Sequence, residues 1–176
     1  MFTRNALGAA LLVLVAGQVI AAETPHLGTP VTPADIAAWD TSISPDGTGL
    51  PPGKGSAAQG KEIYALKCTG CHGVAGEGKP ADRLTGGQGS LATDAPIKTV
   101  GSYWPYATTL FDYVRRAMPL NEPMSLTNDE VYAVSAYVLS LNGLIGEKTE
   151  LNAKTLPKIK MPNHDSFFIV YPGNLK

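Results

Sequence analysis

The residues best equipped for chemistry are two cysteines and a histidine within five positions, in the run Cys68-Thr69-Gly70-Cys71-His72. Two thiols at this spacing can add to the two vinyl groups of a porphyrin, and the histidine that follows then lies under the iron as its proximal ligand. No other cysteine occurs in the 176 residues, so the pair has no disulfide framework to join. The motif therefore predicts one covalently attached haem c, with His72 bound to the iron.

Two other uses of a Cys-x-x-Cys pair fit the sequence less well. A structural zinc site needs four ligands, and His26 and His164 are the only histidines besides His72. A redox-active dithiol of the thioredoxin kind follows a strand in a β-α-β unit, and no such unit is evident around Cys68. We therefore interpret Cys68 and Cys71 as haem attachment sites.

A second axial ligand is expected after the haem motif, and Met118 is the preferred candidate. It precedes a proline shortly before the last expected helix, and a thioether ligand favours reduced iron and raises the reduction potential. Methionines also fill hydrophobic cores, so other donors stay open. These are Met124, Met161, His26 and His164. An iron with no sixth protein ligand is the remaining alternative, and it would suit ligand binding or peroxide chemistry.

An aromatic cluster that contains Tyr103 and Trp104 lies between the haem motif and Met118. The Tyr103 hydroxyl and the Trp104 indole N–H are candidate hydrogen-bond donors to the haem propionates. Packing of the same rings beside the cofactor explains the cluster equally well. Both interpretations of the two residues stay open at this point.

Capping residues and hydrophobic spacing predict the helices that position these groups. Ser56 with Gln59, and Thr127 with Glu130, each form a capping box at the start of a helix. Apolar residues at spacings of three and four give the later helices one buried face each. The expected helices span 56–67, 107–117 and 127–141, and the glycine-rich stretch 73–102 is expected to be loop.

Residues 1–22 have the composition of an export signal. Arg4 supplies a positive start, an apolar run covers 6–16, and Ala21 and Ala22 offer a small-residue cleavage site. The apolar run is shorter than the about 20 residues that a membrane span requires. We therefore predict a periplasmic protein with no membrane span in its mature form, and an uncleaved N-terminal anchor is the alternative. The net charge of −1 gives no reason to expect nucleic acid as a partner.

The stretch 56–143 resembles the class I cytochrome c family. Gly60 and Tyr64 precede Cys68 by eight and four residues, and Met118 is followed by proline, as in that family. The resemblance implies a mainly α fold of three or more helices around one covalently bound haem, with long irregular N- and C-terminal segments. It also implies that the first helix crosses the last one closely. The residues expected at this crossing are Val134, Tyr137 and Val138.

Four longer segments look like the cytochrome subunits of bacterial sulfite dehydrogenases and sulfane dehydrogenases. The segments are WDTSISPDGTGL (39–50), VGSYWPYATTLFDYVRRAMP (100–119), LTNDEVYAVSAYVLSLNG (126–143) and LPKIKMPN (156–163). This resemblance implies that a molybdenum-cofactor dehydrogenase subunit donates electrons and that another cytochrome c accepts them. Some relatives carry two haem domains, whereas this chain has one haem motif.

On this basis we divide the chain into four parts. They are the signal peptide (1–22), an extended N-terminal segment (23–55), the cytochrome c domain (56–146) and a C-terminal tail (147–176) that forms a surface strap or a partly mobile end. The expected role is to accept single electrons, with the sulfur chemistry left to the partner. A freestanding carrier with another donor, or a haem protein with an open iron, is the alternative.

Overall fold

The computed structural model describes residues 27–167, so the expected signal peptide and residue His26 lie outside the described part. The chain divides into two units, Met1–Trp39 and Asp40–Lys176. None of the described helices combines the length and apolar character needed to cross a membrane.

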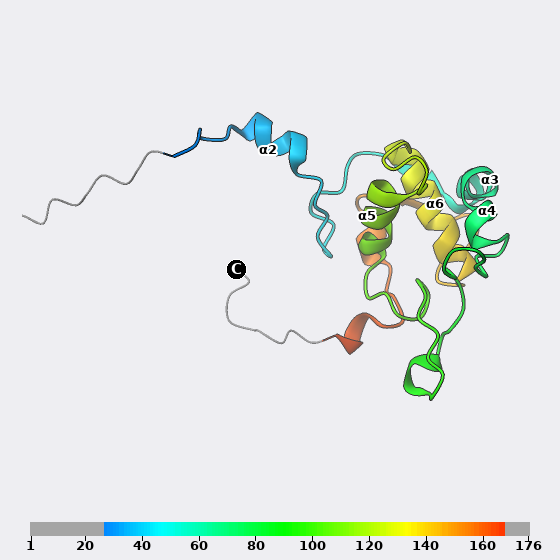
Figure 1. Cartoon of the computed structure of the whole chain (residues 1–176). Helices are drawn as coiled ribbons and strands as arrows, with labels where there is room; N and C mark the ends of the chain where they lie inside the picture. The colour runs from blue at the N-terminus through cyan, green and yellow to red at the C-terminus, as the bar shows by residue number, and fades with distance from the viewer. Residues whose placement is uncertain (1–26, 168–176) are drawn as a thin grey trace, which may run out of the picture. The chain divides into compact units, whose positions relative to one another are not determined.

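In the first unit, the described residues include one short helix, α2 (Pro33–Trp39), which Figure 1 labels. Its first turn is closed by Thr32 and Asp35. The Thr32 amide donates to Asp35 Oδ2 at 2.9 Å, and the Asp35 amide donates to Thr32 Oγ1 at 3.2 Å. The expectation of an extended segment over 23–55 overlooks this helix. The missed signal is a threonine and an aspartate three residues apart around a proline, a pattern typical of a helix start.

The second unit holds the helices expected from the sequence. Its α-helices are α3 (Ala57–Lys67), α4 (Thr69–His72), α5 (Ala107–Ala117) and α6 (Asn128–Leu141). Both expected capping boxes are present. The Ser56 hydroxyl accepts from the Gln59 amide, and the Thr127 hydroxyl accepts from the Glu130 amide. The stretch between α4 and α5 is mostly turns, with one short 3-10 helix, η1 (Ser90–Ala92).

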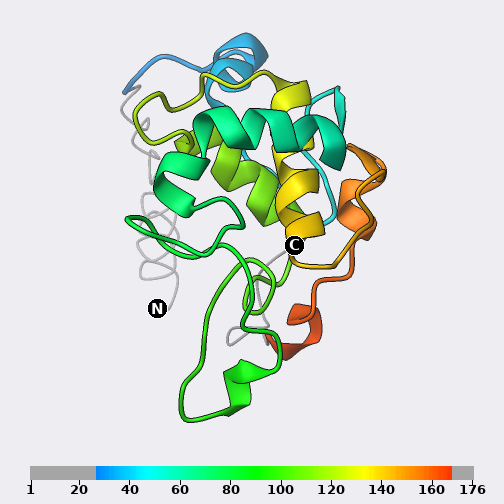
Figure 2. The ribbon, with the colours of Figure 1, turned by 90° about the vertical axis from the view of Figure 1, so that its right-hand side faces the viewer.

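Helix α3 crosses α6 (Figure 2), and the two backbones come closest at Gly60. A Cβ atom at Gly60 would lie 1.9 Å from Ala133 O and 2.9 Å from Tyr137 Cβ, so only glycine fits there. One turn further along α3, the ring of Tyr64 meets that of Tyr137 edge-on, with centroids 5.2 Å apart. The close crossing implied by the class I resemblance is therefore confirmed, and so is Tyr137 as one of its residues. The residue nearest to Gly60 is Ala133, in place of the expected Val134 and Val138, because the backbone of α6 itself forms the contact.

The hydrophobic core lies between α5, α6 and the C-terminal residues. Phe111 of α5 and Tyr132 of α6 are fully buried, and their ring centroids are 4.4 Å apart. Helix α6 is buried on almost every side, because α3 covers one face and α5 another. This packing holds α5, which connects the aromatic cluster to Met118, in a defined place relative to α3.

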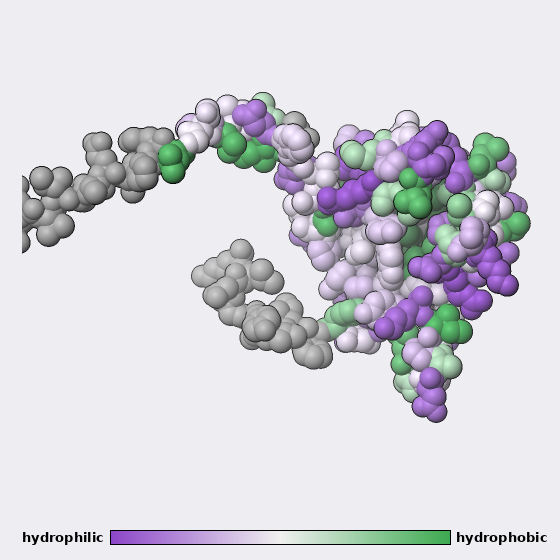
Figure 3. Space-filling view, viewed as in Figure 1, coloured by the Kyte–Doolittle hydropathy of each residue, from purple (hydrophilic) through white to green (hydrophobic). Residues whose placement is uncertain are grey.

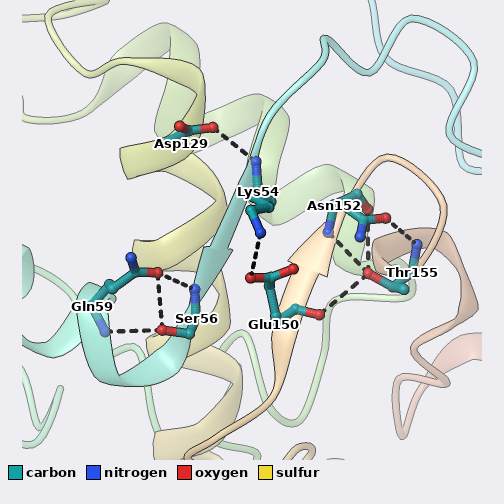
Figure 4. A network of polar contacts seen from close by, with 7 residues as sticks. All are labelled: Lys54, Ser56, Gln59, Asp129, Glu150, Asn152 and Thr155. Atoms are coloured by element: carbon teal, nitrogen blue, oxygen red, sulfur yellow. Dashed lines mark hydrogen bonds and ion pairs between the residues drawn. The ribbon is translucent and has the colours of Figure 1, made fainter.

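A two-stranded antiparallel sheet joins the C-terminal residues to the start of α3. Strand β1 (Lys54–Ser56) pairs with β2 (Glu150–Asn152). Figure 4 shows the polar contacts around the pair: Lys54 Nζ lies 3.3 Å from Glu150 Oε2, and the Lys54 amide donates to Asp129 Oδ1 at 2.8 Å. The sheet thus ties the beginnings of α3 and α6 to the tail.

The described part of the tail, 147–167, contributes three fully buried side chains to the core. They are Leu151, Leu156 and Met161. Two short 3-10 helices, η2 (Leu156–Lys158) and η3 (His164–Ser166), follow β2. The three apolar residues are five positions apart, a spacing that matches neither helix nor strand periodicity. The sequence pattern therefore does not predict that their side chains are buried.

Candidate haem site

The haem motif forms one helical turn, α4, directly after α3. Tyr64 holds both ends of this turn. Its carbonyl accepts from the Cys68 amide at 2.9 Å and from Thr69 Oγ1 at 3.1 Å, and its hydroxyl donates to Gly73 O at 3.0 Å. Because Tyr64 is also buried at the crossing of α3 and α6, the turn is anchored to the core. The fold therefore places two thiols and an imidazole on one short, fixed turn.

The two cysteines are free thiols with different surroundings. Cys71 is exposed, whereas Cys68 is partly buried and packs against the core. Burial raises the pKa of the Cys68 thiol to about 11, so this thiol is neutral at physiological pH. A neutral, partly buried thiol is poorly suited to the thiolate chemistry of a redox-active dithiol.

The His72 ring is oriented by a backbone carbonyl. His72 Nδ1 lies 2.8 Å from Asp82 O. A carbonyl oxygen can only accept, so Nδ1 carries the proton and Nε2 keeps its lone pair. This is the tautomer that binds a metal ion through Nε2, with the second nitrogen fixed by an outer partner. Sequence reasoning did not find Asp82, because a backbone carbonyl leaves no trace in the residue type.

The residues at the motif fit a haem c group. Two adjacent thiols, one imidazole with a free and oriented Nε2, and a turn anchored to the core are the donor set that this group requires. Exposed apolar side chains flank the motif on both sides, since Leu66 is 86% exposed and Val74 is 72% exposed.

Met118 is the residue that ends α5. Its amide donates to Val114 O at 3.1 Å, its backbone is extended, and its side chain is partly buried against the core. Two residues later, Leu120 is 77% exposed. The thioether thus lies at the border between the core and the loop before α6, and its role as sixth ligand remains a prediction.

The other candidate ligands have different surroundings. Met161 is fully buried in the core, and Met124 is 62% exposed. His164 is exposed, and its Nδ1 lies 2.6 Å from Asp165 Oδ1. This hydrogen bond is the main reason why the pKa of the Asp165 carboxyl lies below its usual range. The core packing of Met161 and the Asp165 contact of His164 therefore account for these two side chains without iron.

Tyr103 and Trp104 lie on the loop that leads into α5, at the opposite end of that helix from Met118. The Asn163 side chain donates to Tyr103 O at 2.7 Å, so the tail holds this loop. The Trp104 ring packs against the core and meets the Tyr113 ring edge-on, with centroids 5.8 Å apart. Both residues have packing roles, and their contact with propionates stays a prediction.

The surface of the second unit alternates between hydrophilic and apolar residues on the face that Figure 3 shows. A loop within 86–99, which projects from the helices in Figure 1 and Figure 2, carries residues of both kinds. Its base is closed by Thr99 Oγ1, which donates to Gly86 O at 2.6 Å. The loop is therefore an ordered part of the unit.

Comparisons with known proteins agree with this geometry. The sequence profile of the Cytochrome c family matches residues 57–142. A chain in the crystal structure of the sulfane dehydrogenase SoxCD from Paracoccus pantotrophus is 41% identical, with a TM-score of 0.78. That match covers 86% of this chain and 73% of the other.

A curated protein, the thiosulfate dehydrogenase of Psychrobacter arcticus (strain DSM 17307 / VKM B-2377 / 273-4), is 28% identical over 106 residues. The match covers 56% of this chain and 31% of that protein, so it spans about a third of the relative. The family profile covers the haem motif and all of α3 to α6, and the solved relative extends the similarity to most of both chains. This chain therefore belongs to the cytochrome c family, with the class I fold and the electron-carrying role of that family.

Proposed function

We propose that this chain is the haem subunit of a periplasmic, sulfur-oxidising dehydrogenase. It accepts single electrons from a molybdenum-cofactor subunit that oxidises sulfite or a protein-bound sulfane group, and it passes them to another cytochrome c. The observation that carries the proposal is the 41% identity to a chain of a sulfane dehydrogenase. That match covers 86% of this chain, which is more than the 57–142 that the general family profile covers.

Four side chains hold the cofactor in this proposal. Cys68 and Cys71 would attach haem c covalently, and His72 and Met118 would bind its iron. When bound, the haem supplies a reversible one-electron couple of ferric and ferrous iron. The chain contributes the fixed Nδ1 proton of His72, which keeps Nε2 on the metal, and a thioether, which favours the ferrous state.

The electron count determines how the subunit works. Oxidation of sulfite to sulfate with water as oxygen source releases two electrons and two protons. A chain with one haem motif takes one electron at a time, so the donor must reduce it twice for each sulfite. A downstream cytochrome c therefore has to remove the first electron before the second arrives. The protons remain with the donor subunit and the solvent.

The periplasmic location rests on residues 1–22, which lie outside the described part of the chain. Their positive start, apolar run and small residues are typical of an export signal. Covalent attachment also suits a compartment in which an unattached pair of thiols would become oxidised.

The proposal is tested with protein purified from its native periplasm, together with any partner that remains bound. Visible spectra are recorded before and after adding sulfite, and dithionite is added last. If the donor is a sulfite dehydrogenase, we expect sulfite to raise the reduced-haem bands within seconds, to the level that dithionite reaches. The matched control is the cytochrome chain produced alone, which sulfite should leave oxidised.

Two further additions separate the sulfur donors. Thiosulfate, and a carrier protein bearing a persulfide, are added to separate samples of the native preparation. Reduction by the persulfide alone identifies a sulfane dehydrogenase, and reduction by sulfite identifies a sulfite dehydrogenase. If only dithionite reduces the haem in a preparation that retains a molybdenum subunit, the proposed donor is wrong and a freestanding carrier becomes the better account.

A further inference from the structure

Asn142, at the end of α6, joins that helix to the loop that follows the haem motif. Its Nδ2 donates to Leu84 O at 3.1 Å, and its Oδ1 accepts from the Gly86 amide at 3.1 Å. Nδ2 also lies 2.9 Å from Val138 O, to which it donates, and this bond fixes the amide on its own helix. The side chain therefore holds the loop on both sides of Thr85.

The Asn142 amide is tightly enclosed. The residue is 9% exposed, and a Cβ atom at the buried Gly101 would lie only 2.0 Å from Asn142 Oδ1. From the same loop, Gln88 Nε2 donates to the backbone carbonyl of Asn142 at 3.1 Å. A buried amide whose hydrogen bonds all go to protein groups cannot be removed without leaving those groups unsatisfied.

The same loop carries the carbonyl that orients the proximal histidine. Asp82 O, which accepts from His72 Nδ1 at 2.8 Å, is two residues before Leu84. The Leu84 amide donates to Gly76 O at 2.8 Å, while its carbonyl accepts from Asn142. Both sides of Leu84 are thus held. The Asp82 carbonyl lies between these bonds and the bond that the Ala81 amide donates to Cys71 O at 3.0 Å, so Asn142 secures one of its two sides.

We propose that Asn142 is a positioning residue for the haem iron, which acts through Leu84 and Asp82 on the His72 ring and thereby sets the reduction potential. The inference rests on the proposed haem site at His72. A hydrogen bond from Nδ1 to a carbonyl makes the imidazole a stronger electron donor and stabilises ferric iron. When Asn142 releases the loop, the bond from His72 to Asp82 weakens and ferrous iron is favoured.

The test replaces Asn142 by leucine, which has a similar size and forms neither loop bond. We expect Asn142→Leu to shift the equilibrium between ferric and ferrous iron about threefold toward the ferrous form. At 59 mV per tenfold change, this raises the midpoint potential by about 28 mV. The matched control is Tyr132→Phe. The Tyr132 hydroxyl donates to Pro51 O at 2.9 Å, so this substitution also removes a hydrogen bond from α6 to a loop carbonyl. This control should leave the potential unchanged.

Two readouts are taken on each purified holoprotein. The midpoint potential is measured by redox titration, and exchange of the His72 Nδ1 proton with solvent is followed by NMR in the ferrous state. We expect faster proton exchange in Asn142→Leu than in the wild type or in Tyr132→Phe. If the leucine variant yields no holoprotein, Asn142→Ser carries the same test, because its side chain is too short to reach both Leu84 and Gly86.

An unchanged or lowered potential in the Asn142 variant overturns the positioning role. So does an equal rise in Tyr132→Phe, since that result would reflect general loosening of the fold. Fast exchange of the His72 Nδ1 proton in the wild type also overturns it. A wild-type protein with no histidine-bound haem refutes the proposed haem site instead, so the two failures are distinguishable.

Discussion

Replacing Gly60 by alanine tests the helix crossing that anchors the haem turn. A Cβ atom at Gly60 would lie 1.9 Å from Ala133 O and 2.4 Å from Ala133 C, and these backbone atoms of α6 cannot rotate away. Overpacking of this kind costs about 1–3 kcal/mol. Alanine offsets about 0.5–1 kcal/mol of that, because glycine is a poor residue in a helix. The central values of the two contributions differ by about 1 kcal/mol, so we expect Gly60→Ala to lower the free energy of unfolding by about 1 kcal/mol.

The assay is urea unfolding of the holoprotein, with Ala65→Gly as the matched control on the same helix. Ala65 is exposed, so the reverse exchange there removes no contact and should cost about 0.5–1 kcal/mol through helix propensity alone. One substitution adds a methyl group and the other removes one, and both should lower the free energy of unfolding. If Gly60→Ala stabilises the protein, α3 and α6 do not meet at Gly60 and the reasoning about the crossing is refuted.

Met118→Ala should abolish the methionine-to-iron charge-transfer band and lower the midpoint potential, because the thioether favours ferrous iron; an unchanged spectrum removes Met118 from the ligand position. Leu156→Ala should lower the free energy of unfolding by about 2–5 kcal/mol, because it opens a cavity under a fully buried tail residue. Its control, Lys154→Ala at an exposed position, should change it by less than about 0.5 kcal/mol. Burial raises the pKa of Tyr132 to about 12 in the folded protein. In the unfolded chain the same hydroxyl ionises near its usual pKa of about 10, so the free energy of unfolding falls as the pH rises above about 10. Tyr132→Phe should flatten that fall in unfolding curves measured at several alkaline pH values.

The sequence predicted the parts of the fold that depend on local signals. Ser56 with Gln59, and Thr127 with Glu130, mark helix starts because each pair satisfies backbone groups within one turn. The glycine at the α3–α6 crossing was expected from the resemblance to the class I family, in which a glycine precedes the first haem cysteine by eight residues. The haem motif needed no tertiary information, because its three reactive groups lie on one turn of chain.

The parts that escaped prediction depend on contacts between distant segments. Asp82 orients His72 through a carbonyl that any residue would provide, and nothing in the residue type of Asn142 predicts its bonds to the loop after the haem motif. The buried tail residues escaped because their spacing of five fits no regular element. In each case the information lies in which segments meet in space, and one sequence does not display it.

The central claim is that one haem is attached through Cys68 and Cys71, and mass spectrometry of the denatured native protein tests it most directly. Trypsin cleaves after Lys67 and Arg83, and it should spare Lys79, which precedes a proline, so the peptide 68–83 contains the whole motif. We predict that this peptide carries the added mass of one haem and that no other peptide does. A peptide 68–83 without that mass, whether as two free thiols or as an internal disulfide, would contradict the account.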